Sequence, residues 1–287
     1  MSTGYQTRQI ESADEFLTLT REFRSREPIS TQIMNAAAQA VSKGSATYES
    51  ARWWVVESNL DVVGIAIHTA PHSIFLSPMP LEAAPVLADL ICASEQRFPG
   101  VNGPLEVVES FLSRCLDIFQ DGISFEIEQT HLSYLLDQVI PPKNVSGKIR
   151  YATVKDRDLV LTWFQAFEIE AEVKSHDLES VVDRVTSNRM LYLWTVGDEI
   201  VSLAGHSFAV ETLLGNLCRI GPVYTPPEQR KKGYASFLVA GISSVLKARG
   251  LAVMLYADAK NQDSNKVYSN IGFNQVGVNT IWKTTWN

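Results

Sequence analysis

Residues 223–235 of this chain read VYTPPEQRKKGYA, and this stretch carries most of the information about the fold. A β-branched and aromatic segment ends at two prolines, and a basic loop with one glycine leads into an apolar helix. The unpaired amides at a helix start carry positive partial charge, so a phosphate binds well there. Gly233 would let a ligand approach the backbone closely. The stretch matches neither GxxxxGK[ST] nor GxGxxG, and a solvated basic turn is the competing interpretation.

The elements around this stretch predict an α/β or α+β fold with a mostly central sheet. Apolar residues recur at helical spacing after Gly233, and Gly250 closes that helix. The predicted order is a strand over 216–225, a helix over 235–249, a buried strand over 251–257, a polar loop over 258–263, a short helix ending near Asn270 and a last strand over 276–286.

Two motifs of this region resemble one protein family. The pattern R-x-x-G-x-A at Arg230, Gly233 and Ala235 resembles the pyrophosphate-binding signature of the GNAT superfamily of acetyl-CoA-dependent N-acetyltransferases. Residues 261–273, NQDSNKVYSNIGF, are similar to that family's N-x-x-S-N-x-x-Y-x-x-x-G-F ending. Because both motifs occur in this order, with a helix and a buried strand between them, the resemblance is specific over residues 149–287.

The resemblance implies a set of site residues. Acetyl-CoA is the implied acetyl donor, and Tyr268 would lie close to its sulfur and protonate the leaving thiolate, although a core aromatic on a helix is the alternative. A backbone amide of the strand would stabilise the oxyanion, and no covalent intermediate through Cys218 is needed. The residues implied in cofactor binding are Val223, Tyr224 and Thr225 along the pantetheine arm, Arg230, Lys231, Lys232, Gly233, Tyr234, Ala235 and Ser236 at the pyrophosphate, and Asn261 and Ser264 toward the thioester end.

The first half of the chain resembles a degenerate copy of the same domain. Residues 54–66 and 194–204 both read as strand, polar turn and strand, which indicates a tandem repeat unless the pairing is coincidental. Residues 100–104, GVNGP, lie where the counterpart of the basic loop is expected, and they contain no basic residue. We therefore expect tandem GNAT-like domains, each a central mixed β-sheet flanked by helices.

A breaker segment separates the two predicted domains. Residues 141–148 read PPKNVSGK, which is typical of a linker. The expected organisation is a degenerate N-terminal domain over 1–140, the linker over 141–148 and a catalytic domain over 149–287. From sequence, residues 121–139 could pack against either sheet.

Composition limits the function classes. The 287 residues carry 25 basic and 32 acidic side chains, a net charge of −7, which argues against general binding to nucleic acid or anionic membranes. Three scattered cysteines and five histidines without ligand spacing predict neither disulfides nor a metal site. With no signal peptide or membrane span visible, we expect a cytoplasmic protein, a monomer or a homodimer.

Other candidates for the chemistry are weaker. Glu168, Glu170 and Glu172 fall on the first helix of the second half, where one could be a general base or an amine-binding carboxylate, although a solvated face is the simpler interpretation. His206 in an apolar strand reads as a core histidine, and Trp53, Trp54, Trp163 and Trp194 read as core or interface residues.

The predicted function is transfer of acetyl from acetyl-CoA to a primary amine by direct attack in a ternary complex. The acceptor would be a small-molecule or peptide amine, which the sequence does not identify further. A non-catalytic acyl-CoA-binding or regulatory protein of the same fold is the alternative, and a protein-protein scaffold would suit the first half alone.

Overall fold

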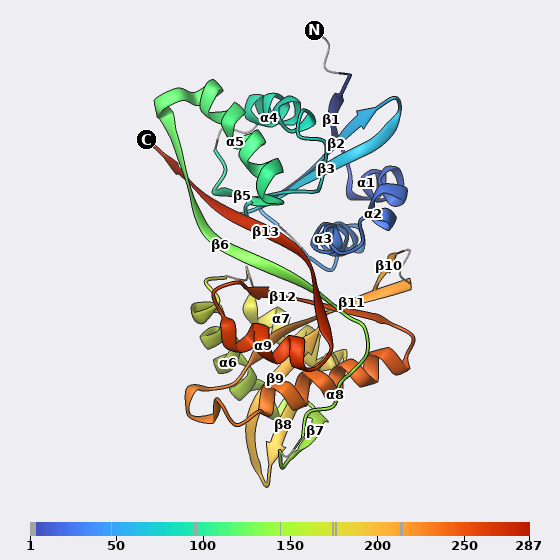
Figure 1. The fold of residues 1–287 in the computed structure, drawn as a ribbon, viewed down its shortest axis with the longest axis vertical. Helices are drawn as coiled ribbons and strands as arrows, with labels where there is room; N and C mark the ends of the chain where they lie inside the picture. Colours follow the sequence, from blue (N-terminus) through green and yellow to red (C-terminus); the bar gives the residue numbers. More distant parts are fainter. Residues whose placement is uncertain are drawn as a thin grey trace.

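The computed structural model describes residues 4–46, 48–94, 97–143, 145–173, 175, 177–212 and 215–287. Within the first half, a strand and helices precede a β-hairpin, and strands then alternate with helices (Figure 1). The elements are β1 (Gln6–Ile10), α1 (Ala13–Leu19), α2 (Arg21–Arg26), α3 (Gln32–Ser42), β2 (Ser50–Ser58), β3 (Asp61–Ala70), β4 (Ile74–Leu76), α4 (Ala83–Ser94), β5 (Gly100–Gly103), α5 (Leu105–Phe119), a 3₁₀ turn (Gln120–Gly122) and β6 (Ile123–Leu136).

Among the described residues the second half has nearly the same order of elements, but it has two α-helices before its hairpin where the first half has three, and it adds the short strand β10. That order is compatible with the predicted tandem repeat. The elements are β7 (Lys148–Tyr151), a 3₁₀ turn (Val154–Asp156), α6 (Arg157–Glu170), α7 (Leu178–Ser187), β8 (Leu191–Val196), β9 (Glu199–His206), β10 (Val210–Thr212), β11 (Gly215–Tyr224), a 3₁₀ turn (Pro227–Gln229), α8 (Tyr234–Ala248), β12 (Ala252–Asp258), α9 (Gln262–Asn270) and β13 (Phe273–Trp286).

Both predicted hairpins form. Strands β2 and β3 pair antiparallel around Asn59 and Leu60, whose positive φ angles of 51° and 72° fit the tight turn that matches strand twist. Strands β8 and β9 pair antiparallel around Gly197 and Asp198. Trp53, Trp54 and Trp194 from these hairpins are buried, which confirms their assignment to the core.

The two halves exchange their last strands. In the described residues the sheet order is β1-β2-β3-β4-β5-β13-β6-β12-β11-β9-β8-β7, with β10 on β11. Strand β6 of the first half pairs with β12 of the second, while β13 of the second half pairs with β5 of the first. Strands β6 and β13 also pair with each other, and Figure 1 shows both running from one half into the other. Residues 121–139 therefore serve both halves.

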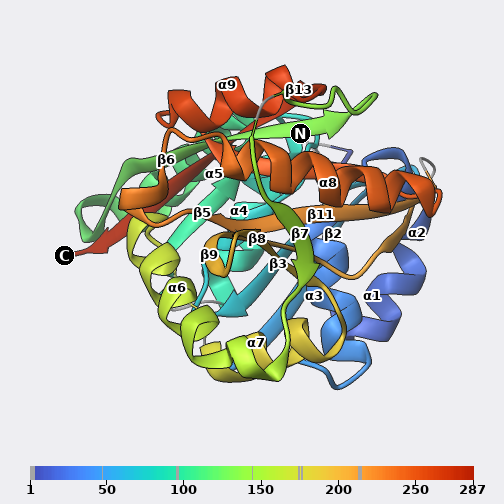
Figure 2. The ribbon, with the colours of Figure 1, turned by 90° about the horizontal axis from the view of Figure 1, so that it is seen from below.

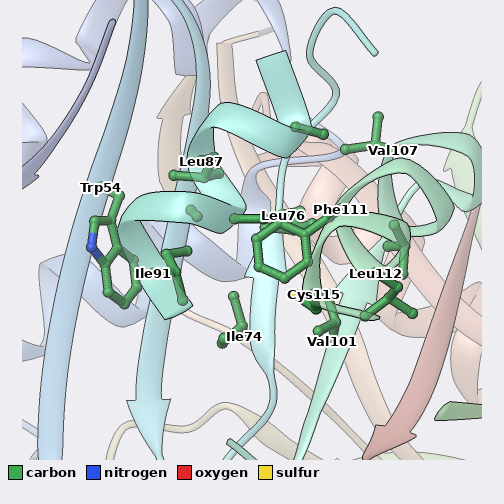
Figure 3. Packing of buried hydrophobic residues seen from close by; sticks show 14 of the residues in the cluster. Trp54, Ile74, Leu76, Leu87, Ile91, Val101, Val107, Phe111, Leu112 and Cys115 are labelled. Atoms are coloured by element: carbon green, nitrogen blue, oxygen red, sulfur yellow. The ribbon is translucent and has the colours of Figure 1, made fainter. Parts of the chain in front are cut away.

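The buried cores follow this exchange. Helices α4 and α5 cover the first-half sheet, where Trp54, Leu76 and Phe111 pack together (Figure 3), and Trp282 and Trp286 of β13 pack against the same cluster. In the second half, Tyr134 of β6 joins the core beneath α8 and α9. Helices α6 and α7 lie on the opposite side of the sheet from α8 and α9 (Figure 2). Each core is thus completed by a strand from the other half.

One sequence interpretation is wrong. Residues 100–104 were expected to contain the counterpart of the basic loop, but Gly100–Gly103 is strand β5. A Cβ at Gly100 would lie 2.2 Å from the carbonyl oxygen of Trp282, so this glycine permits close strand packing rather than a turn. By their position between β4 and α4, residues 77–82 are the counterpart, and they also lack a basic residue.

We predict that Trp286→Ala lowers the free energy of unfolding by about 3 kcal/mol. The indole packs edge-on against Phe98 and Phe119, with ring centroids 5.5 and 5.1 Å away, and Nε1 donates to the Phe98 carbonyl at 3.0 Å. Trp286→Phe keeps the ring contacts and should cost about 1 kcal/mol for the lost hydrogen bond. Urea denaturation of both variants checks this, and equal losses would contradict it.

Candidate functional site

Strands β11 and β12 separate at their carboxyl ends. They pair in parallel only from Leu217 to Ile220, where Ile220 lies opposite Leu255. Beyond that point β11 continues along β9, while Tyr256–Asp258 of β12 pairs with β6. Ligands of open α/β sheets bind at such carboxyl ends. Val223, Tyr224 and Thr225 lie on or just beyond the end of β11, where the strand still pairs with β9 but no longer with β12.

The basic loop leads from this strand end to an uncapped helix. Gly233 is the N-cap of α8 with φ of 82°, a conformation that favours glycine, and no side chain of the described residues caps the helix. The first helical hydrogen bond is donated by the Phe237 amide to the Gly233 carbonyl at 3.2 Å. The amides of Tyr234, Ala235 and Ser236 precede it, which leaves them available for an anion.

The Arg230 side chain is bound by α6 and by the end of β11. Its Nη2 lies 2.6 and 2.7 Å from the two carboxylate oxygens of Glu170, and its Nε donates to the Thr225 carbonyl at 2.9 Å. The guanidinium lies 5.9 Å from the centre of the Tyr224 ring, which faces α6 through a contact with Trp163. In this arrangement Arg230 fastens the loop to α6.

The two lysines of the loop are exposed. Lys232 Nζ donates to Gln229 Oε1 at 2.8 Å, and Lys231 has a positive φ of 61°. Thr225 Oγ1 lies 2.9 Å from Ser202 Oγ, which ties the strand end to β9. Positive charge next to the α8 amides therefore comes from Lys231 and Lys232 in the described structure.

The second motif forms helix α9, and its asparagine has a structural role. Asn261 is the N-cap, and its Oδ1 accepts from the Ser264 amide at 3.0 Å. Ser264 also hydrogen-bonds the Tyr268 hydroxyl. Both residues thus shape the helix that presents Tyr268.

Tyr268 is buried between aromatic rings. Its ring centroid lies 6.1 Å from that of Tyr134 on β6 and 6.2 Å from that of Phe273 on β13. Burial raises the pKa of Tyr268 to about 12, and the hydrogen bond with Ser264 opposes that rise. The phenol therefore stays protonated at neutral pH and can only donate its proton.

Comparison with known proteins identifies the fold. Residues 203–286 match the family described as FR47-like protein. A GCN5-related N-acetyltransferase from Sphaerobacter thermophilus superimposes with a TM-score of 0.64 at 14% identity, over 99% of this chain and 96% of that one. This chain has the GNAT fold. No curated protein matches the sequence.

Two further solved structures superimpose over both halves. An acetyltransferase of the GNAT family from Colwellia psychrerythraea gives a TM-score of 0.57 at 13% identity, over 98% of this chain and 100% of that one. A Drosophila protein gives a TM-score of 0.65 at 14% identity, over 97% of this chain and 98% of that one. At these identities the comparisons establish the fold, and the resemblance predicted from the two motifs is confirmed.

The glutamates of α6 and its end each have a partner. Glu168 Oε1 accepts from the Ser175 amide at 2.7 Å, Glu170 binds Arg230, and Glu172 Oε2 accepts from Gln129 Nε2 at 3.2 Å. Glu170 and Glu172 are exposed, as expected for a solvated helix face. All three side chains nevertheless accept hydrogen bonds. They order the loop after α6 and connect α6 with its neighbours.

Two polar groups of the core are not suited to nucleophilic chemistry. Burial raises the pKa of the Cys218 thiol to about 11, so the thiolate is scarce at neutral pH. His206 Nδ1 lies 2.9 Å from the Ser207 carbonyl, and burial lowers the pKa of this imidazole. Both side chains are buried in the packed sheet. For His206 this agrees with the sequence analysis, which reads it as a core histidine.

Two further features are absent from the described residues. In the residues that the structure describes, no group of three or more histidines, cysteines and carboxylates is placed to hold a metal ion. No helix in that part of the chain is long and apolar enough to cross a membrane.

We predict that Gly233→Trp abolishes acetyl-CoA binding while the chain stays folded. The residue is exposed, so the main stability cost is the left-handed backbone, about 1–2 kcal/mol. A Cβ there would lie 2.9 Å from Val145 Cγ2, a side-chain atom that must shift slightly. A bulky side chain at the start of α8 would occupy the space in front of its free amides. Calorimetric titration with acetyl-CoA and circular dichroism measure the two effects.

Gly250→Trp is the matched control for this prediction. Gly250 has φ of 77° and lies just beyond the other end of α8, where an added Cβ would meet no other atom within 4 Å. It should lose similar stability and bind acetyl-CoA normally. Normal binding by Gly233→Trp would mean that the loop is only a solvated basic turn.

Proposed function

We propose that this protein transfers acetyl from acetyl-CoA to a primary amine by direct attack in a ternary complex. The GNAT-fold acetyltransferases that it resembles support acetyl transfer in general. The observation that carries the proposal is the separation of β11 from β12 beside a helix start with free amides. Few other arrangements offer a groove for an extended thioester arm and an anion site at its end.

The chain's own residues fit acetyl-CoA as donor. The amides of Tyr234, Ala235 and Ser236, with Lys231 and Lys232, would bind the pyrophosphate. The backbone at Val223 and Thr225 would hydrogen-bond the pantetheine arm, since β12 no longer pairs with this part of β11. When bound, acetyl-CoA supplies an activated acyl group. The resemblance implies that Arg230 lies at the pyrophosphate. In this structure it would hold the basic loop in position through its ion pair with Glu170.

Tyr268 is the proposed general acid. Its phenol stays protonated because burial raises its pKa to about 12, so it is ready to donate a proton to the leaving sulfur. A backbone amide at the separated strand end would stabilise the negative charge on the carbonyl oxygen. The reaction needs an uncharged amine, since only the free base has a nucleophilic lone pair.

A panel of amines tests the function. Amino acids, polyamines, aminoglycosides and peptide N-termini should each be mixed with acetyl-CoA, and acetylated product and released thiol measured together. Transfer to at least one class supports the proposal. Tight acetyl-CoA binding without transfer to any class would favour the non-catalytic acyl-CoA-binding alternative.

We predict that Tyr268→Phe lowers kcat and kcat/KM together by about 10²–10⁴-fold, with acetyl-CoA affinity nearly unchanged. The phenyl ring keeps the contacts with Tyr134 and Phe273, so the fold should hold. Because the pKa of Tyr268 is raised, loss of its proton should cause no fall in wild-type activity below about pH 10. Steady-state kinetics from pH 6 to 10 measure both. A defect confined to acetyl-CoA affinity would make Tyr268 a binding residue.

We predict one acetyl-CoA site per chain. In the first half the amides of Ala83 and Ala84 at the start of α4 donate to the carbonyls of Pro80 and Leu81, at 2.9 and 3.3 Å. These amides are therefore occupied, whereas those of α8 are free. Isothermal titration should give a stoichiometry near one, and a value near two would show that the first half also binds.

A further inference from the structure

A row of polar side chains crosses the middle of the sheet on one face. Gln129, His131 and Ser133 alternate along β6, so they point to the same side. Asp258 of β12 and Asn279 of β13 are the Cα partners of His131 on its two neighbouring strands. Other strands of the sheet also bury single polar side chains, such as Ser202 and His206 on β9, but this row brings polar side chains of three neighbouring strands together.

Hydrogen bonds fix the orientation of Gln129. Its Nε2 donates to the Ala171 carbonyl and to Glu172 Oε2, both at 3.2 Å. These two acceptors require the amide nitrogen to face the end of α6. The amide oxygen, Oε1, therefore faces the opposite way, toward His131.

The orientation of Gln129 sets the tautomer of His131. Gln129 Oε1 lies 2.9 Å from His131 Nε2 and can only accept, so Nε2 carries the proton. The lone pair is then on Nδ1, and no described residue donates a hydrogen bond to it. A neutral imidazole with a free Nδ1 is a proton acceptor.

His131 lies at the open end of the candidate site. Its partner Asp258 comes three residues after Leu255, the last residue of β12 that pairs with β11. Tyr134, on the other face of β6, contacts Tyr268, so the proposed acid lies on the α8 and α9 side. His131 therefore faces the opposite side, between α6 and the first half.

A cavity borders this row of side chains. It has a volume of about 400 Å³, and Ser133 and Asn279 contribute to its lining together with Arg26 at the end of α2 and residues 27–30 of the loop that follows. Both side chains are buried, at 3% and 8% exposure, and neither has a hydrogen bond to a described residue. We expect an acceptor amine to reach His131 from this cavity, because its lining includes Asn279, the neighbour of His131 on β13.

We propose that His131 is the general base of the acetyl transfer, with Nδ1 accepting the proton of the attacking amine, and that Gln129 positions it. This rests on the proposed function. As the nitrogen–carbon bond forms and the carbon–sulfur bond breaks, one proton leaves nitrogen for His131 and one passes from Tyr268 to sulfur. His131 and Tyr268 then return to their starting states through solvent, so protons balance.

The charged groups facing His131 agree with this role. Burial lowers the pKa of His131, and the Asp258 carboxylate opposes that shift. The Glu172 carboxylate interacts with His131 indirectly. It accepts a hydrogen bond from Gln129, and Gln129 in turn hydrogen-bonds His131. The imidazole is therefore neutral at pH 7, and activity should fall as the pH drops through its pKa.

Removing the imidazole tests the proposal. His131→Ala should lower kcat/KM by about 10²–10⁴-fold at pH 7 with unchanged acetyl-CoA affinity, and added imidazole should restore part of the rate. His131→Phe fills the space and should be slow without rescue. His72→Ala removes an exposed histidine of the first half and is the control for loss of a histidine. A full rate in both His131 variants would overturn the proposal and leave the acetyltransferase function standing.

Two measurements separate a base from a structural residue. In Asp258→Asn the acid limb of the kcat/KM profile should move to lower pH, because the carboxylate that raises the His131 pKa is gone. Nitrogen-15 spectra of the wild type at pH 7 should show His131 as the Nε2–H tautomer, and Gln129→Leu should weaken that preference and lower kcat. An Nδ1–H tautomer, or an unmoved acid limb, would overturn the proposal. A wild type that acetylates no amine would overturn it together with the proposed function.

Discussion

The antiparallel pairing of β6 with β13 is the interaction on which the rest of the structure depends. It extends from Phe273 opposite Leu136 to Trp286 opposite Ile123. Through it, each half of the chain completes its sheet and its core with a strand of the other half. The hydrophobic area that the exchanged strands bury gives the two halves a common stability, in contrast to domains tethered by a linker.

The exchange also decides how the candidate site is built. The donor side is local in sequence, because β11, the basic loop and α8 follow one another within the second half. The face opposite α8 is composite, since β6 and the α2–α3 loop come from the first half. Under the proposed function, the first half would contribute side chains to the chemistry without an anion site of its own.

Local signals made the second half predictable from the sequence. Prolines after β11, the glycine before α8 and the helical spacing within it act over a few residues, and the two motifs located Tyr268. Non-local contacts were not predictable in the same way. The partner of Arg230 is Glu170, 60 residues away, and strand exchange leaves no local pattern. The glycines of residues 100–103 read as a turn because close backbone packing against Trp282 requires the same residue type. The alternation of Gln129, His131 and Ser133 was visible in the sequence, but its meaning depended on knowing which face it occupies.

The strand exchange bears on how the chain emerges from the ribosome. Strand β13 is synthesised after all the other described elements, and it pairs with β5, which is made some 180 residues earlier. Until then β5 has an open edge, and the core beneath α4 and α5 lacks Trp282 and Trp286. Unpaired strand edges and exposed apolar surface make a partly folded chain prone to aggregation, and the nascent chain exposes both until β13 is made. Many two-domain proteins can fold one domain before the next is synthesised. In this protein the first half cannot complete its sheet and core in that way, because both need β13.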